Sequence, residues 1–417
     1  MVRAAAAASF GAQLLRYPEV WRDRSLPFPP NLPLFDWLPA LPEPGGLAIW
    51  ASMLAALVVV ISGKWARGAA IYLAVAYTVM CGLDQVRFQP HFTVSPILLL
   101  IATWSGPSPE QALRGVRVAL ASVYFFAGLA KLNANYFTLV HPAMMKPVVE
   151  LMPALSPLLE VSWIPPLVEM SVGAAVLYPG SWRRRRFVVA GALGMHAFIL
   201  TMLLSASHDA TVIPFNLALA LCAVAVLVDS NDPEPRVRLR ELGRTSGGRV
   251  ALAYGVIVPA LSLIGLADMY YSHAYYAGTE GRMRWYAKPE VFARFPMLAN
   301  RKLKVPQVPP GAKPIPEGMY ELPMHNGFAH FLGQAVVGEA RIADAVKAQV
   351  CAFAASTPDA VIARYYGPAH PITGERRYRD ARCGERLGFW LRFGGFATVV
   401  IGGDGPIETL EQHGAPF

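Results

Sequence analysis

The chain has 417 residues, of which 54% are hydrophobic and 16% are charged, and its mean hydropathy is +0.36. This composition is unusual for a soluble domain and is typical of a polytopic membrane protein. The formal net charge of +9 is therefore interpreted loop by loop as a topology signal, and no nucleic-acid partner is predicted. Without a CxxC pair among its four cysteines, the chain lacks the usual signature of a thiol oxidoreductase.

Residues 1–46 are predicted to form an N-terminal helix followed by a proline-rich connection. The helix carries Arg3 and an alanine run, but its apolar core is short and no clear small-x-small cleavage site follows it. Two alternatives remain open for it, a helix at the membrane surface and a short first span. Seven prolines in residues 25–45 favour an irregular connection outside the membrane.

Eight apolar runs are candidates to cross a hydrocarbon core about 30 Å thick. They lie at residues 47–63, 68–84, 91–104, 113–131, 164–179, 187–206, 210–228 and 250–268. The third run is short and the fifth opens with Pro165 and Pro166, so a tilt or a break is expected at either. The fold prediction is an all-α membrane helical bundle of about eight spans over residues 47–268.

Arginine and lysine are unevenly distributed among the loops. The loops that follow the first, third, fifth and seventh spans hold or adjoin thirteen of them, against two in the other loops besides Lys131. This bias predicts that the basic set lies in the cytoplasm and that the other loops and the C-terminal tail lie outside. Seven basic residues between 282 and 304 run against this assignment, although charges far along a tail carry little topological weight.

Residues 269–417 are predicted to form a small α+β domain outside the membrane. Aromatic residues at 270–276 are typical of a membrane interface, and residues 306–316 are rich in proline. Further on, residues 338–356 are helix-like and residues 388–401 are strand-like. Cys351 and Cys383 both lie here, where an oxidising compartment would permit a disulfide, and two free thiols are the alternative.

The predicted topology brings scattered polar residues to one depth near the outer face. Lys131 ends the fourth span, His91 opens the third, and Glu169 lies in the outer half of the fifth. Ionisable groups inside a membrane are costly and usually face a bundle interior, so a polar pocket open to the outside is expected. The candidate site residues are Asp84, Arg87, Gln89, His91, Lys131, Glu169, His196 and Asn216.

Each candidate also has a structural interpretation. Lys131 is equally consistent with an anchor whose amine reaches the lipid headgroups, and Asp84 with Arg87 is consistent with a surface ion pair or a loop cap. For Glu169, a buried pair with a lysine or a histidine is expected. The functional alternative is base chemistry, because a lysine amine kept away from water can accept a proton. GxSxG, HExxH, P-loop and GxGxxG motifs are missing, and no metal site is predicted.

Residues 124–136, YFFAGLAKLNANY, resemble a segment of the vitamin K-dependent γ-glutamyl carboxylases and of the wider horizontally transferred transmembrane (HTTM) family. The resemblance covers roughly residues 47–230 and implies that Lys131 is the base that deprotonates a reduced, vitamin K-like quinone. Residues 194–196 and 213–216 are similar to later family segments and imply a pocket position for His196. His91 resembles the family histidine ahead of a long apolar helix.

The family reaction is the oxygenation of the reduced quinone to an epoxide, which drives removal of a γ-proton from a substrate glutamate and addition of carbon dioxide. The resemblance therefore implies a membrane enzyme of the carboxylase type, a lyase, with oxygen and carbon dioxide as co-substrates. It also implies a site that faces the periplasm or exterior of a bacterial inner or plasma membrane. Membrane lipid and a peptide or protein substrate on that side are the implied partners.

The same Gly-x-x-Lys-Leu ending also resembles the smaller DoxX and MauE-like redox-associated membrane proteins. That resemblance implies an accessory protein without catalytic activity, which helps another protein to mature or to be exported. Lys131 would then only anchor its helix. The enzyme is the favoured hypothesis and the accessory protein is the alternative.

Overall fold

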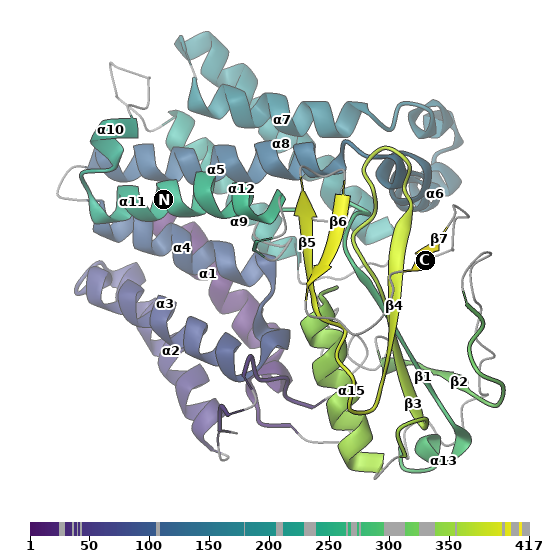
Figure 1. Ribbon diagram of the computed structural model, residues 1–417. Coiled ribbons are helices and arrows are strands. Elements are labelled where there is room, and N and C mark those ends of the chain that lie inside the picture. The colour runs from purple at the N-terminus through teal and green to yellow at the C-terminus, as the bar shows by residue number, and fades with distance from the viewer. Residues whose placement is uncertain are drawn as a thin grey trace.

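The computed structural model describes residues 1–24, 30–35, 37–39, 41, 44–105, 109–178, 180–205, 212–228, 239–263, 266–267, 273–274, 277–295, 313–324, 338–354, 357–393, 397–401 and 408–410. A bundle of helices takes up most of the molecule, and a β-sheet with one long helix lies beside it (Figure 1). Among the described residues, the bundle helices end at Leu263 and the first strand begins at Arg282.

Apolar helices occupy all eight predicted span positions. They are α2 (Gly45–Ser62), α3 (Ala66–Leu83), α4 (Pro90–Trp104), α5 (Pro109–Lys131), α7 (Ile164–Leu177), α8 (Trp182–Ser205), α9 (Val212–Val228) and the continuous run of α11 (Ser246–Leu252), the π-helical η5 (Ala253–Ile257) and α12 (Val258–Leu263). Within the described residues, five of these are long and apolar enough to cross a membrane by length and composition, namely α2, α3, α5, α8 and the α11–α12 run.

The prediction of about eight spans was therefore too high. α4, α7 and α9 are shorter apolar helices. At about 1.5 Å per residue, the 14 residues of α7 rise about 21 Å, which is less than a hydrocarbon core of about 30 Å. Pro165 and Pro166 lie in the first turn of α7, where their missing N–H groups are tolerated, and the preceding residues form a separate 3₁₀ segment, η4 (Pro153–Leu159).

The N-terminal helix α1 (Val2–Arg16) is a packed element of the bundle. It contacts α4 and α9, and Ala6, Phe10 and Leu14, spaced four residues apart on one face, are fully buried. The ring of Phe10 meets Tyr77 of α3 edge-on, with 5.7 Å between ring centroids. This packing makes α1 part of the helical bundle.

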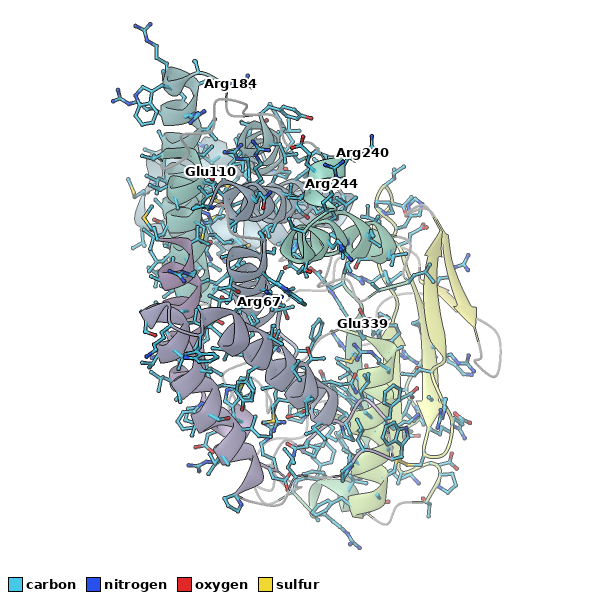
Figure 2. The ribbon with its side chains drawn as sticks, turned by 90° about the vertical axis from the view of Figure 1, so that its left-hand side faces the viewer. Arg67, Glu110, Arg184, Arg240, Arg244 and Glu339 are labelled. Atoms are coloured by element: carbon cyan, nitrogen blue, oxygen red, sulfur yellow. A yellow bond between two sulfur atoms is a disulfide. The ribbon has the colours of Figure 1, made fainter. Side chains whose placement is uncertain are left out.

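The predicted basic loops gather at one end of the bundle. Arg114 near the start of α5 forms an ion pair with Glu241 of α10 (Leu239–Leu242) at 3.2 Å. The guanidinium of Arg67, at the start of α3, lies 5.4 Å from the ring centroid of Trp104 at the end of α4. Figure 2 looks onto this end and labels Arg67, Arg184, Arg240 and Arg244. Segments that are far apart in the sequence thus share the same end, as the charge bias predicts.

The C-terminal region is built on an antiparallel sheet with the strand order β2-β1-β3-β4-β7. The strands are β1 (Arg282–Ala287), β2 (Tyr320–Leu322), β3 (Val361–Tyr366), β4 (Arg376–Arg382) and β7 (Glu408–Leu410), and β5 (Phe389–Phe393) pairs with β6 (Ala397–Ile401) as a separate hairpin. The helix α15 (Ala340–Ala354) packs on β3 and β1. Cys351 of α15 and Cys383 form a disulfide, so the paired alternative is the one found.

This α+β region is bonded to the end of α5. The Nδ2 of Asn133 donates to the carbonyl of Ala277 at 2.8 Å, and the Nδ2 of Asn135 donates to the carbonyl of Gly278 at 3.2 Å. Gly278 has φ +76°, and a Cβ there would lie 2.8 Å from a methyl of Val140. Only glycine suits both the backbone conformation and this close approach. The segment after Lys131 is therefore one of the contacts between the bundle and the α+β region, and Arg341, which donates to Gln85, makes another.

A buried histidine near this contact predicts a dependence of stability on pH. His273 is fully buried with its ring against Tyr254, and burial lowers the pKa of its imidazole to about 3. An unfolded histidine has a pKa of about 6.5 and binds the proton first, so stability falls as the pH falls from about 6.5 toward 3, by about 2 kcal/mol at about pH 5.

His273→Asn is expected to remove this part of the acid destabilisation, because asparagine tolerates the positive φ of 59° and does not titrate. The measurement is the melting temperature of the purified protein at about pH 7.5 and about pH 5, for both proteins in one detergent. An equal drop in wild type and variant would contradict the assignment.

Candidate functional site

Lys131, the last residue of α5, forms a buried ion pair with Glu169 of α7. Its Nζ donates to both carboxylate oxygens, at 2.7 Å and 2.6 Å. The side chains are only 10% and 7% exposed. An amine that anchors a helix by reaching the lipid headgroups would be exposed, so the geometry favours the pocket interpretation of Lys131 over the anchor.

Two glycines allow α5 and α7 to approach closely enough for this pair. Gly128 lies three residues before Lys131, and a Cβ there would be 2.4 Å from the carbonyl oxygen of Pro166. Gly173 lies four residues after Glu169, and a Cβ there would be 2.7 Å from the carbonyl oxygen of Ala121. The glycine of the Ala-Gly-x-x-Lys motif is therefore a helix contact that brings the ion pair together.

A second polar group is centred on His196 of α8. Its Nε2 lies 2.9 Å from the Oη of Tyr124, and its Nδ1 lies 2.9 Å from the Oδ1 of Asn216. The Nδ2 of Asn216 donates to the carbonyl of Val212 at 2.9 Å, so the amide oxygen faces the imidazole. Nδ1 of His196 therefore donates, and in the neutral ring Nε2 accepts from the Tyr124 hydroxyl.

Both groups open onto one cavity of about 350 Å³ inside the bundle. The cavity is lined by five of the predicted site residues, namely His91, Lys131, Glu169, His196 and Asn216. Most of the remaining wall is apolar and includes Val123, Ala127, Val168, Met195, Met202, Phe215 and Leu219. The convergence expected from the topology is thus found for these five residues.

Two histidines of the cavity wall have a ring nitrogen without a hydrogen-bond partner among the described residues. These are Nε2 of His91 and Nδ1 of His141. Both side chains are buried, and a buried polar atom normally has a partner. Each nitrogen is thus an unsatisfied buried atom in the cavity wall, and a ligand in the cavity would meet it only if the imidazole ring turned.

His141 and Tyr136 were missed by the sequence analysis. Tyr136 begins the π-helical η3 (Tyr136–Val140) and His141 begins α6 (His141–Leu151). Both lie in the stretch between the fourth and fifth predicted spans, which was expected to be a loop. Burial lowers the pKa of His141 and raises that of Tyr136, so both groups are neutral near pH 7. The signal that was available was the pair of aromatic residues 136–137 with His141 shortly after Lys131.

Asp84, Arg87 and Gln89 do not line this cavity. Asp84 is fully buried and caps η2 (Gln85–Arg87) by accepting from the backbone N–H of Val86 at 3.2 Å, and it also forms an ion pair with Arg24. Asp84 is therefore a loop cap and not part of a surface ion pair. The Nε2 of Gln89 donates a hydrogen bond to the nearby carbonyl of Val86 at 3.1 Å.

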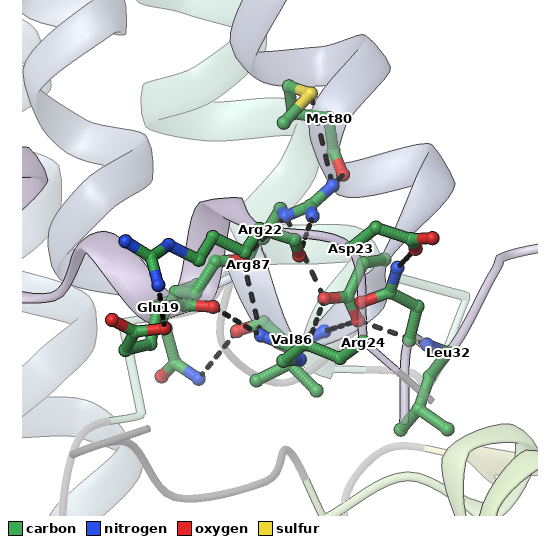
Figure 3. A network of polar contacts seen from close by, with 12 residues as sticks. Glu19, Arg22, Asp23, Arg24, Leu32, Met80, Val86 and Arg87 are labelled. Carbon is green, nitrogen blue, oxygen red and sulfur yellow. Dashed lines mark hydrogen bonds and ion pairs between the residues drawn. The ribbon is translucent and has the colours of Figure 1, made fainter. Parts of the chain in front are cut away.

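The network around Asp84 fastens the N-terminal connection to the bundle (Figure 3). The guanidinium of Arg87 donates to the carbonyls of Val20 and Arg22, at 2.8 Å and 3.2 Å. The backbone N–H of Leu32 donates to Asp84 at 3.1 Å. A structural role accounts for every one of these contacts.

No family model matches the chain, and no curated protein or solved structure matches it. Among the described residues, no group of three or more histidine, cysteine, aspartate or glutamate side chains is placed to hold a metal ion.

Proposed function

We propose that the protein is a membrane enzyme that binds a lipid-soluble ligand in the cavity and removes a proton from a hydroxyl group of that ligand. The observation that carries the proposal is the Lys131–Glu169 ion pair, which opens onto an otherwise largely apolar space. The cavity volume of about 350 Å³ falls within the range of about 300–1,000 Å³ found for small-molecule sites.

The cost of burying an ion pair supports a functional role. Two charges lose their hydration on burial, and replacing such a pair by apolar residues of similar volume is often neutral or stabilising. Ionisable groups inside membrane bundles are correspondingly rare, and they mark functional sites. A pair placed in a cavity wall beside His91 and His196 therefore favours chemistry over a purely structural contact.

Proton transfer within the pair turns it into a base. When the proton of Lys131 moves to Glu169, a neutral amine faces a carboxylic acid. A ligand hydroxyl can then give its proton to the amine, and the ammonium formed stabilises the oxyanion that remains. Tyr124, His196 and Asn216 supply a fixed hydrogen-bond network beside this pair.

A reduced quinone is the ligand class that suits these walls. Its ring would pack against the apolar side chains, and its hydroxyl groups would lie beside Lys131 and the imidazole rings of His91 and His141. The choice of a quinone over other lipid-soluble hydroxyl compounds comes from the resemblance of residues 124–136 to the carboxylases, and the apolar walls are compatible with it. The proposal in its full form includes oxygenation of the quinone and carboxylation of a glutamate side chain, with oxygen and carbon dioxide as co-substrates.

The proposal predicts that Lys131→Met abolishes deprotonation of a bound hydroquinone. The full-length protein in lipid nanodiscs is mixed anaerobically with a methyl-naphthohydroquinone, and the absorbance of the anion is followed. Oxygen uptake after admission of air is then measured, and the variant is expected to lose about 100-fold or more of this rate, as is typical of general-base catalysis.

Lys146→Met is the matched control. Lys146 lies in the exposed pair with Glu150, at 4.0 Å, and its loss is expected to change neither measurement. Tyr124→Phe keeps the ring and removes one hydroxyl, so it is expected to fold and to react more slowly. Full activity of a folded Lys131→Met variant would overturn the base assignment, and an inactive wild type would favour the accessory-protein alternative.

A further inference from the structure

A second hollow lies on the outside of the bundle, between α7 and α8. It has a volume of about 530 Å³ and extends along α7 from Trp163 to Ala175, which is about 18 Å at about 1.5 Å per residue. Its walls are mainly apolar, and Trp163, directly before α7, and Phe187 of α8 are among the exposed large hydrophobic residues. α8 is long and apolar enough to span a membrane, and a groove on the outer side of such a helix would face lipid.

The groove and the cavity share part of one wall. Ile164 and Val168 of α7 line both spaces, and each is also exposed on the outer surface, at 37% and 40%. They lie four residues apart and so form one strip along the helix. Glu169, which holds Lys131, follows Val168 directly. At this strip the thickness of a single side chain separates lipid from the site.

The α+β region covers the end of α5 close to this site. The carbonyls of Ala277 and Gly278 accept from Asn133 and Asn135, and the backbone N–H of Ala134 donates to the carbonyl of Pro371 at 2.8 Å. A ligand with a long apolar tail would have to leave the bilayer and pass this contact to reach Lys131 from the aqueous side. The groove avoids that path.

We propose that the ligand reaches the cavity sideways from the bilayer between α7 and α8, and that its apolar tail remains in the groove while its polar head lies at Lys131. The inference rests on the proposed function for the nature of the head group. The occupant of the groove is the hydrocarbon or isoprenoid tail of that same molecule. Ile164 and Val168 are the side chains that must turn aside as the head passes.

Gly191 of α8 provides a way to close the groove. It lines the groove, and a Cβ built there would lie 3.9 Å from a methyl of Val172, so a tryptophan at this position would fill the space. Gly194, three residues later, is exposed with no atom within 4 Å of its built Cβ and does not line the groove. Gly191→Trp is therefore the test variant and Gly194→Trp is the matched control.

The experiment uses the full-length protein in nanodiscs with a long-chain fatty alcohol that carries a diazirine next to its hydroxyl group, so that the reactive carbon travels with the polar head. After irradiation, cross-linked peptides are mapped by mass spectrometry. Wild type and Gly194→Trp are expected to give cross-links to the cavity residues Met195 and Met202, and Gly191→Trp to lose them. Cross-links to Leu193, which is exposed on α8 and lines neither space, are expected to persist in all three proteins.

Cavity cross-links that are missing in wild type, or that persist in Gly191→Trp, would overturn the sideways route. The outcome is separable from that of the proposed function. If the cavity is labelled but no hydroquinone is deprotonated, the route stands and the proposed function falls. If a tail-less hydroquinone is deprotonated while the long-chain probe never labels the cavity, the route alone falls.

Discussion

Glu169→Gln is expected to lower the free energy of unfolding by about 3–5 kcal/mol, the usual cost of breaking a buried ion pair by removing one partner. The substitution preserves the shape of the side chain, but it leaves the Lys131 ammonium in the cavity wall without its counter-charge. Lys131→Met is expected to destabilise the protein similarly, because it leaves the Glu169 carboxylate without both of its short hydrogen bonds. Unfolding of the purified protein in detergent, followed by circular dichroism, measures both changes.

The double variant Lys131→Met/Glu169→Leu distinguishes a charge effect from simple loss of packing. With both charges removed, most of the stability is expected to return, since apolar replacement of a buried pair is often neutral or better. Its activity is expected to stay absent, which separates folding from chemistry. Lys146→Met/Glu150→Gln serves as control, because this exposed pair contributes about 0–1 kcal/mol. If the double variant were as unstable as the single ones, the ion pair would not be the cause.

Gly128→Val is expected to cost about 3 kcal/mol and to abolish activity, because it forces α5 and α7 apart. Even a single added carbon would lie 2.4 Å from the carbonyl oxygen of Pro166, and backbone cannot move aside as a flexible side chain can. Separation of the two helices would also pull Lys131 away from Glu169. The measurements are thermal unfolding and the hydroquinone assay on the same preparation.

Gly82→Ala in α3 is the control for this second prediction. No atom lies within 4 Å of a Cβ built on Gly82, so alanine fits there and adds helix propensity of up to about 1 kcal/mol. The variant is expected to be as stable as wild type or slightly more stable. A Gly128→Val protein that unfolds like wild type would show that close packing of α5 on α7 is not required.

The positions of the apolar helices could be predicted because hydrophobic runs are a property of the local sequence. The runs predicted at residues 91–104 and 164–179 agree with α4 and α7 within two residues, but helices of 15 and 14 residues are short for a membrane span. Counting such short runs as spans made the predicted number too high. The α+β region was predicted from helix-like and strand-like segments, but the order of its sheet depends on long-range pairing between β1 and β3.

The five cavity residues could be predicted from topology alone. Spans that alternate in direction bring Lys131, His91 and Glu169 to the same end of the bundle. A charged side chain inside a span is energetically costly, so it is expected to form an ion pair or a hydrogen bond. Asp84 and Arg87 were also predicted at this end of the bundle, but they belong to another hydrogen-bond network. Their partners, Arg24 and Val20, lie about sixty residues earlier in the sequence, in a segment with no hydrophobic periodicity that would predict the contact. His141 was missed because α6 is short and only moderately apolar.

The contact between Asn133, Asn135 and the loop at residues 277–278 has a practical consequence for dissecting the protein. A chain shortened to its first 268 residues would lose the carbonyls that accept from both side-chain amides, and the turn beside Lys131 would have to satisfy them with water. Shortening at the boundary between the two regions would therefore disturb the chemistry it is meant to isolate. The site at Lys131 is therefore better studied by single substitutions in the full-length protein than by truncation.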